Sequence, residues 1–151
     1  PAIASYVGIS ALLMDLPNPA EVMFAALIGD LGLLRMSPKH FKQDFNNLSE
    51  EDQNAYINHP LLSVNLVLER KLPITDKIRH IILNSHENIL GKGFPKGNKC
   101  VRDKISIESQ LIQVCEQLDQ KLIIKPGEMR PKIDDVKAQL IGDLEKSGTL
   151  T

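Results

Sequence analysis

The sequence lacks tryptophan, has few other aromatic residues and carries no excess of charge of either sign. Aromatic residues make up 4% of the 151 residues, and 18 basic residues stand against 19 acidic ones, for a net charge of −1. Proteins that hold single-stranded nucleic acids stack the bases on aromatic side chains, and polyanion binding needs a basic surplus. We therefore expect no nucleic-acid polymer as a partner.

Cysteines and long apolar runs are also scarce. Cys100 and Cys115 are the only cysteines. They are too few for a disulfide framework, which favours a reducing compartment. No apolar run approaches the roughly 20 residues that span a bilayer, and no signal peptide begins the chain. We expect a cytoplasmic protein with no membrane insertion in this segment.

Helical periodicity is the main signal that the sequence does contain. Apolar residues recur at spacings of three and four, and no alternating pattern typical of strands is present. A hydrophobic content of 42% is enough for one compact domain, residues 1–151. Because the chain does not begin with methionine, we expect it to be a fragment of a longer multidomain protein. The predicted fold is all-α, with helices at residues 2–16, 19–28, 75–85, 105–124 and 131–145, and further helices between the Ser49 capping box and Pro73.

The second predicted helix leads to the first candidate residue. Asn18 and Glu21 have capping-box spacing around Pro19, and residues 22–28 are apolar on every side. We therefore expect this helix to be the central buried one. Asp30 follows its end. If buried, its carboxylate needs an arginine, a backbone amide or a metal ion; the alternative is a turn residue in water.

A histidine lies within an apolar stripe further along. His59 shares this stripe with Ala55, Leu62 and Leu66. Pro60 disfavours helical geometry at the residue before it, so we expect His59 at a break between helices. It is either a hydrogen-bonded core histidine or a ligand.

The segment around residue 86 contains a second histidine of this kind. The preceding helix is expected to bury Ile78, Ile81, Ile82 and Ser85, which places His86 at the edge of that face. The loop that follows has glycines that can bring amide groups close to an anion, and lysines that add positive charge. We predict a substrate or partner loop, with a solvated connection as the alternative. Its residues are Gly91, Lys92, Gly93, Phe94, Pro95 and Lys96.

The long helix at residues 105–124 contains a carboxylate within an apolar stripe. Glu116 lies among Ile105, Ile112 and Ile123, where a charge needs neutralising. Alternatively, the stripe is only partly buried and Glu116 reaches water. The remaining face of this helix is polar and contains Ser109, Gln113, Gln117 and Gln120.

These segments together resemble the HD-GYP family of HD phosphohydrolases, which hydrolyse cyclic di-GMP. Members read His-His-Glu, two residues, then Asp-Gly-X-Gly-Tyr-Pro, and residues 85–95 here read Ser-His-Glu-Asn-Ile-Leu-Gly-Lys-Gly-Phe-Pro. Residues 25–32, Ala-Ala-Leu-Ile-Gly-Asp-Leu-Gly, resemble the HD motif. His59-Pro60 matches a His-Pro pair of the family, and Val114-Cys115-Glu116 is similar to its Val-Ala-Asp. The resemblance covers nearly the whole chain and implies an HD-domain-like helical bundle.

The resemblance also implies metal-assisted phosphodiester hydrolysis, with two or three metal ions in the family, usually iron or manganese. The implied ligands are Asp30, His59, His86 and Glu116. Gly29 and Ser85 replace family histidines, Leu33 replaces a lysine, and residues 2–5 lack a further histidine. Four ligands can hold one divalent ion, but a two-metal clamp needs more. We therefore expect one iron or manganese ion, or none.

Our leading hypothesis is a degenerate HD-GYP-like domain of bacterial cyclic di-GMP signalling with impaired phosphodiesterase activity. It would act as a ligand-binding or protein-interaction module for cyclic di-GMP or GGDEF-domain proteins, and a homodimer is compatible with this role. One alternative is a weak phosphodiesterase with Asp30 as its candidate catalytic residue. The other is a purely structural signalling module.

Overall fold

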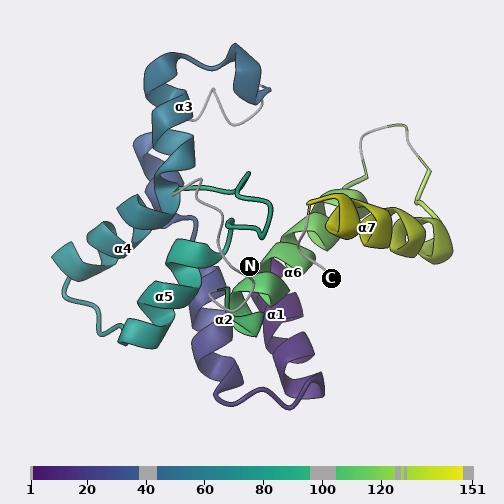
Figure 1. Cartoon of the computed structure of the whole chain (residues 1–151), viewed down its shortest axis with the longest axis horizontal. Coiled ribbons are helices and arrows are strands. Elements are labelled where there is room, and N and C mark those ends of the chain that lie inside the picture. The colour runs from purple at the N-terminus through teal and green to yellow at the C-terminus, as the bar shows by residue number, and fades with distance from the viewer. Residues whose placement is uncertain (1, 38–43, 96–104, 125–126, 128, 148–151) are drawn as a thin grey trace.

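The computed structural model describes residues 2–37, 44–95, 105–124, 127 and 129–147 (Figure 1). Over these ranges the chain forms seven α-helices, two short 3-10 helices and no strand, which confirms the all-α prediction. The elements are α1 (Ala2–Leu13), α2 (Pro19–Ile28), η1 (Leu31–Arg35), η3 (Phe45–Asn47), α3 (Glu50–Ile57), α4 (His59–Glu69), α5 (Asp76–Asn84), α6 (Ile107–Leu122) and α7 (Ile133–Ser147). None of the described helices is long and apolar enough to cross a membrane.

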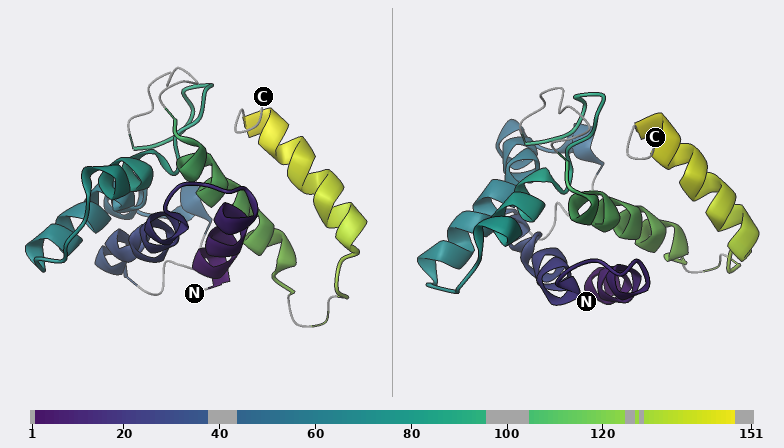
Figure 2. Two further views of the ribbon diagram at one scale, coloured as in Figure 1. Left: turned by 90° about the horizontal axis from the view of Figure 1, so that it is seen from below. Right: turned by 60° about the horizontal axis from the view of Figure 1, so that its bottom comes forward.

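The core is formed where α1, α2, α4, α5 and α6 meet. Helix α1 packs against α2 and α6, and α2 packs against α5 (Figure 1). Helix α7 lies at one edge of the molecule and packs on α6 (Figure 2). Each fully buried aliphatic side chain stabilises the fold by about 1.5–3 kcal/mol. The buried side chains of this core include Val7, Ala11, Val22, Ala25, Ile81, Ile82 and Ile112.

Helix α5 forms as the sequence predicts. Thr75 caps its start, with the Thr75 side chain accepting a hydrogen bond from the Ile78 amide. Ile78, Ile81 and Ile82 are buried, and so is Ser85, which directly follows the helix. The buried face of α5, which leads toward His86, is therefore the face that the apolar spacing predicted to be buried.

The second helix differs from the prediction, because it is not buried on all sides. Met23 and Leu27 are 43% and 55% exposed. The reason is that α2 lies at the outside of the bundle and covers the core with one face only. Its predicted capping box is also absent: Asn18 has φ 58° and ψ 58° and makes no capping hydrogen bond through its side chain. Glu21 instead accepts a hydrogen bond from the Thr75 hydroxyl.

Other helices also begin or end at different residues from those expected: α6 covers Ile107–Leu122 rather than residues 105–124, and α1 and α7 differ as well. Helix α1 ends at Leu13, because Asp15 and Asn18 adopt left-handed backbone conformations, φ 52° and 58°, that turn the chain back. Helix α7 begins at Ile133, whose side chain is 82% exposed, and buries Val136 and Leu144.

The polar face of α6 is partly buried, and its apolar stripes are partly exposed. Ser109 is fully buried and donates a hydrogen bond to the Ile81 carbonyl, and Gln113 donates to the Glu87 carbonyl. Ile107 and Ile123 are half exposed or more. Polar side chains on this side of α6 are therefore buried because they donate hydrogen bonds to backbone carbonyls of α5 and of the segment after it. The periodicity of apolar residues does not reveal this requirement.

Candidate metal centre

His59 is held by the backbone at the break between α3 and α4. It is the first residue of α4, is 2% exposed, and has Pro60 after it, as the sequence predicts. Its Nδ1 lies 2.6 Å from the Tyr56 carbonyl oxygen. Because a carbonyl only accepts hydrogen bonds, Nδ1 carries the hydrogen. In the neutral ring, the Nε2 lone pair is then free to bind a cation.

His86 brings a second imidazole to the same place. Its Nε2 lies 3.1 Å from the His59 Nε2. Phe94 stacks on the His86 ring, with centroids 4.6 Å apart and planes 17° apart, and the Phe94 amide donates a hydrogen bond to the His86 carbonyl. The loop predicted to follow His86 therefore folds back and holds this imidazole in position.

Asp30 supplies an oxygen from the turn between α2 and η1. Its Oδ1 lies 3.4 Å from the His59 Nε2, and half of its side chain is exposed. Ser63 of α4 fixes this turn, because its hydroxyl donates to the Gly29 carbonyl and accepts from the Gly32 amide. The backbones of η1 and α4 approach so closely that a Cβ on Gly32 would lie 2.2 Å from the His59 carbonyl oxygen.

The three side chains form one cluster. Ligand atoms of Asp30, His59 and His86 all lie within 4.8 Å of one another. A carboxylate oxygen and two imidazole nitrogens that converge in this way repel one another unless a proton or a cation lies between them. Nitrogen and oxygen donors of these types suit iron, manganese and other divalent transition metals. The residues present therefore fit one metal ion.

Glu116 is also brought to this region, but on the other side of His86. Its Oε2 lies 3.5 Å from the His86 Nδ1, the nitrogen that points away from the cluster. The structure thus brings together all four residues predicted from the sequence. It puts Glu116 where a carboxyl group can orient the imidazole of His86 through its second nitrogen, and direct ligation by Glu116 stays a prediction.

Burial and neighbouring charges shift the pKa values of these groups. Burial, together with the charge of His59, lowers the pKa of His86 to about 4, so its imidazole is neutral at pH 7. Burial, with the charge of Asp30, raises the pKa of Glu116 to about 8. Burial alone would raise the pKa of Asp30, but the hydrogen bond to His59 and the charges of His59 and His86 outweigh it and lower the pKa.

Two of the positions where the family resemblance implies further histidines, residues 29 and 85, offer no side-chain ligand here. Gly29 has no side chain, and its carbonyl is occupied by Ser63. Ser85 is buried, and its hydroxyl donates to the Ile82 carbonyl in the last turn of α5.

Three backbone amides of the predicted loop already donate hydrogen bonds to neighbouring protein groups, and the role of the loop stays a prediction. The amides of Gly91 and Lys92 donate to the carbonyl and the side chain of Asn88, and the Phe94 amide donates to His86. The described residues 91–95 instead offer the ring of Phe94 and the exposed side chain of Lys92. Lys96 lies outside the described residues.

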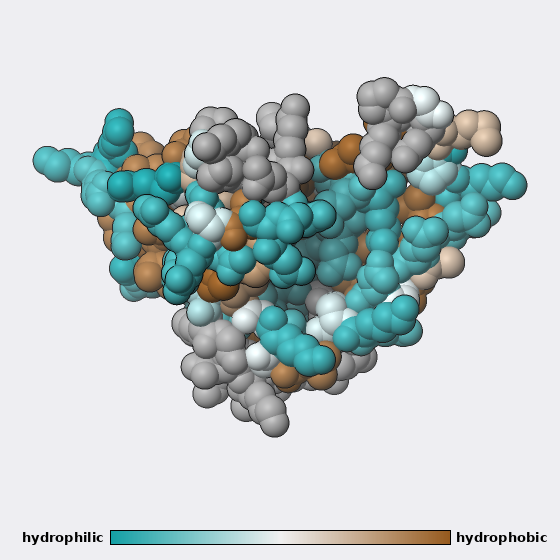
Figure 3. Space-filling view, turned by 90° about the horizontal axis from the view of Figure 1, so that it is seen from above, coloured by the Kyte–Doolittle hydropathy of each residue, from teal (hydrophilic) through white to brown (hydrophobic). Residues whose placement is uncertain are grey.

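A polar hollow of about 250 Å³ lies beside His86, and Lys92, Gln113 and Glu116 also line it. The surface between the α4 side and the α7 side of the molecule is hollowed and largely hydrophilic (Figure 3). A ligand in the polar hollow would lie against His86, whereas Asp30 and His59 do not line it.

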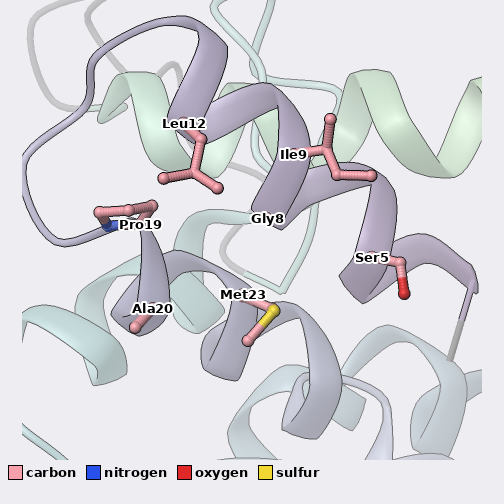
Figure 4. Close-up of a pocket in the computed structure, with 7 residues that line it drawn as sticks. All are labelled: Ser5, Gly8, Ile9, Leu12, Pro19, Ala20 and Met23. Carbon is pink, nitrogen blue, oxygen red and sulfur yellow. The ribbon is translucent and has the colours of Figure 1, made fainter.

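A second hollow of about 490 Å³ lies between α1 and α2 (Figure 4). Apolar side chains such as Ile9, Leu12 and Met23 line most of it, and it shares no lining residue with the metal centre. No titratable side chain contributes to it, so we assign the chemistry to the polar hollow.

Sequence reasoning missed several residues that build the centre. Tyr56 orients His59 through its carbonyl, Ser63 fixes the Asp30 turn, and Gln113 holds the backbone next to His86. The contact of Tyr56 is made by its backbone carbonyl, which every residue has, so the residue type gave no signal for it. The contacts of Ser63 and Gln113 join residues far apart in sequence and left no local signal.

The fold and the centre together define an all-helical domain whose histidine and carboxylate side chains can hold a divalent metal ion. Residues 2–132 match the HD domain family, and the chain belongs to this family of the HD phosphohydrolase superfamily. HD domains typically bind divalent metals, in agreement with the cluster of Asp30, His59 and His86. The comparison with curated proteins gives no match.

Proposed function

We propose that this HD domain is a degenerate HD-GYP-type domain of bacterial cyclic di-GMP signalling. In this role it binds cyclic di-GMP as a signalling module and hydrolyses it poorly. One observation carries the proposal: within the ranges that the structure describes, the donor set is large enough for one ion only. Asp30, His59 and His86 converge within 4.8 Å, whereas Gly29 and Ser85 offer no imidazole.

The centre needs little else to recognise a phosphodiester. A divalent ion held by Asp30, His59 and His86, iron or manganese, would act as a Lewis acid on a phosphate oxygen. The Tyr56 carbonyl keeps the His59 Nε2 free for that ion. Lys92 lines the polar hollow and attracts the phosphate charge. A clamp on both the attacking and the leaving oxygen needs a second ion and more ligands, so we propose slow hydrolysis.

A weak one-metal phosphodiesterase is the second candidate, and the surroundings of Asp30 favour it. His59 and His86 lower the pKa of this carboxyl group, and half of its side chain is exposed. An ionised, accessible carboxylate next to a bound phosphate can position a water molecule for attack.

The test combines metal analysis with cyclic di-GMP binding in two histidine variants. His86→Ala removes one nitrogen of the cluster, whereas His80→Ala removes an exposed histidine of α5 that does not belong to it. We expect no more than one iron or manganese ion per chain in the wild type and in His80→Ala. In His86→Ala the metal affinity should fall at least about tenfold. Calorimetry should detect cyclic di-GMP binding to the metal-loaded wild type, with slow turnover.

Three other results would redirect the proposal. Two ions per chain with rapid hydrolysis that His86→Ala abolishes would contradict degeneracy. One ion with slow hydrolysis lost in His86→Ala would favour the second candidate. If neither cyclic di-GMP nor a GGDEF-domain protein bound to the domain, a purely structural module would be favoured.

A further inference from the structure

The few aromatic residues of this chain gather at one place. The sequence contains four phenylalanines and two tyrosines, and three of these six line a single hollow of about 500 Å³. The ring centroids of Phe45 and Tyr56 are 5.5 Å apart, and those of Tyr56 and Phe94 are 5.7 Å apart. We call this hollow, walled by Phe45, Tyr56 and Phe94, the aromatic pocket.

Two of these rings remain open to solvent. Phe45 and Tyr56 are 39% and 38% exposed, although aromatic side chains gain most when buried. The pairs are tilted, with interplanar angles of 58° and 48°, so the rings do not cover each other face to face. The pocket therefore offers ring surface to a planar ligand.

The aromatic pocket is continuous with the metal centre. Tyr56, Lys92, Gly93 and Phe94 line both this pocket and the polar hollow beside His86. Phe94 forms the boundary, because the same ring stacks on His86. Lys92 supplies a positive charge at the junction. A ligand with an anionic group at the centre would extend its adjoining part into the aromatic pocket.

We propose that the aromatic pocket binds the planar base of a nucleotide whose phosphate lies at Lys92 and the metal centre. This inference rests on the proposed function and adds the residues that select the ligand. Bases stack on aromatic side chains without requiring a particular hydrogen-bond pattern. Phe45 and Tyr56 thus become base-binding residues, which no motif of the HD domain indicated.

Tyrosine fluorescence provides a direct test, since the chain has no tryptophan and its only tyrosines are Tyr6 and Tyr56. Tyr6 lines a different hollow, against α6 and α7. We expect cyclic di-GMP and GMP to quench the emission of the metal-loaded wild type and of Tyr6→Phe. In Tyr56→Phe the quenching should disappear, while calorimetry should still detect binding of the nucleotides. Any loss of emission that remains in this variant measures the light absorbed by the ligand and serves as the correction. Ribose 5-phosphate, which has no base, should cause no quenching.

Affinity provides the second measurement. We expect Phe45→Ala to weaken cyclic di-GMP binding on the order of tenfold, as loss of one stacking ring does. Phe45→Leu keeps an apolar side chain. It replaces the alanine variant if circular dichroism shows that Phe45→Ala is unfolded. It should weaken binding as well, because it offers no ring.

The outcomes separate this inference from the proposed function. Cyclic di-GMP binding that leaves the Tyr56 emission unchanged and is unaffected by either Phe45 variant would overturn the aromatic pocket and leave the proposed function intact. Quenching by GMP without any cyclic di-GMP binding would overturn the proposed function and support the pocket. Failure of both nucleotides to bind would overturn both.

Discussion

At the residue scale, Gly93 and Gly142 have different surroundings, and a change to alanine should therefore have different effects at the two positions. A Cβ on Gly93 would lie 2.3 Å from the His86 carbonyl oxygen and 2.5 Å from the Glu87 Cα, so the loop reaches His86 only because residue 93 has no side chain. A Cβ on Gly142 in α7 would meet nothing within 4 Å.

The two alanine variants should therefore differ in sign. Gly93→Ala displaces the loop backbone and should destabilise the fold by about 1–3 kcal/mol. It should also weaken the stacking of Phe94 on His86. Gly142→Ala should stabilise the fold by about 0.5–1 kcal/mol, because glycine is costly within a helix. Urea unfolding of both variants measures the difference, and a loss of stability in Gly142→Ala, or none in Gly93→Ala, would contradict the packing described.

Glu116 allows a test of its position relative to the metal ion. Because it faces the Nδ1 of His86 at 3.5 Å, Glu116→Gln should lower metal affinity about tenfold and leave the stoichiometry unchanged, as changes to a residue behind a ligand do. Asp119→Asn, one turn further along α6, is the control and should have little effect. Titration of the metal-free variants with manganese measures both quantities. A loss as complete as that of His86→Ala would instead make Glu116 a direct ligand.

The residues of the centre differ in how far the sequence could predict them. Asp30, His59, His86 and Glu116 could be found because each lies in a segment that resembles a motif. Phe45 could not, because its role depends on η3 lying against the end of α3 and on a ring contact with Tyr56. Motif matching finds side chains at positions where a known family has metal ligands. Residues that complete a pocket by contact with distant residues can be found only in the folded chain.

At the scale of elements, an ion pair between the partly exposed Lys77 and the nearly buried Glu108 connects α5 to α6. The Lys77 Nζ lies 2.9 Å from the Glu108 Oε1, and the side chain of Glu108 is 10% exposed. Burial alone would raise the pKa of Glu108, but hydrogen bonds from Lys77 and its own backbone, with the Lys77 charge, outweigh it and lower the pKa. A carboxyl group with a lowered pKa in the folded state stabilises the fold above its unfolded pKa.

The stabilisation by this pair should thus depend on pH. Lys77→Met should cost about 1 kcal/mol near pH 7. The difference from the wild type should be fully present above the unfolded glutamate pKa of about 4.3 and should shrink as the pH falls through the lower folded value. Arg79→Met is the control, because Arg79 pairs with the exposed Asp76 within α5. Thermal unfolding between pH 7 and pH 3 measures this, and a pH-independent loss would argue against the ion pair as the cause.

Helices with strong local signals were predicted well, and those shaped by their neighbours were not. Helix α5 has a Thr75 cap and isoleucines at helical spacing, and both signals operate within a few residues. The burial of Ser109 and Gln113 in α6 depends on carbonyls of residues 81 and 87, which lie 26 to 28 positions away. The exposure of Met23 depends likewise on where α2 lies in the bundle.

At the scale of the whole molecule, α7 differs from the other helices. The HD domain match covers residues 2–132, and α7 begins at Ile133. Its buried side chains are Val136 and Leu144, and an exposed pair, Lys121 with Asp143, adds a contact to α6. So few buried contacts give a helix a low free energy of local opening. Yet Ser147, at its end, lines the polar hollow beside His86.

We therefore expect α7 to open independently of the core. In amide hydrogen exchange, α7 should exchange at least about tenfold faster than α5, which corresponds to about 1.4 kcal/mol less local stability. Leu144→Ala should speed exchange in α7 further and leave α5 and the manganese stoichiometry unchanged, because the ligands of the centre lie on other elements. Val67→Ala, in the core, is the comparison and should speed exchange throughout. If Leu144→Ala instead released the metal ion, α7 would be part of what holds the centre together, and the folding unit would extend beyond the segment matched by the family.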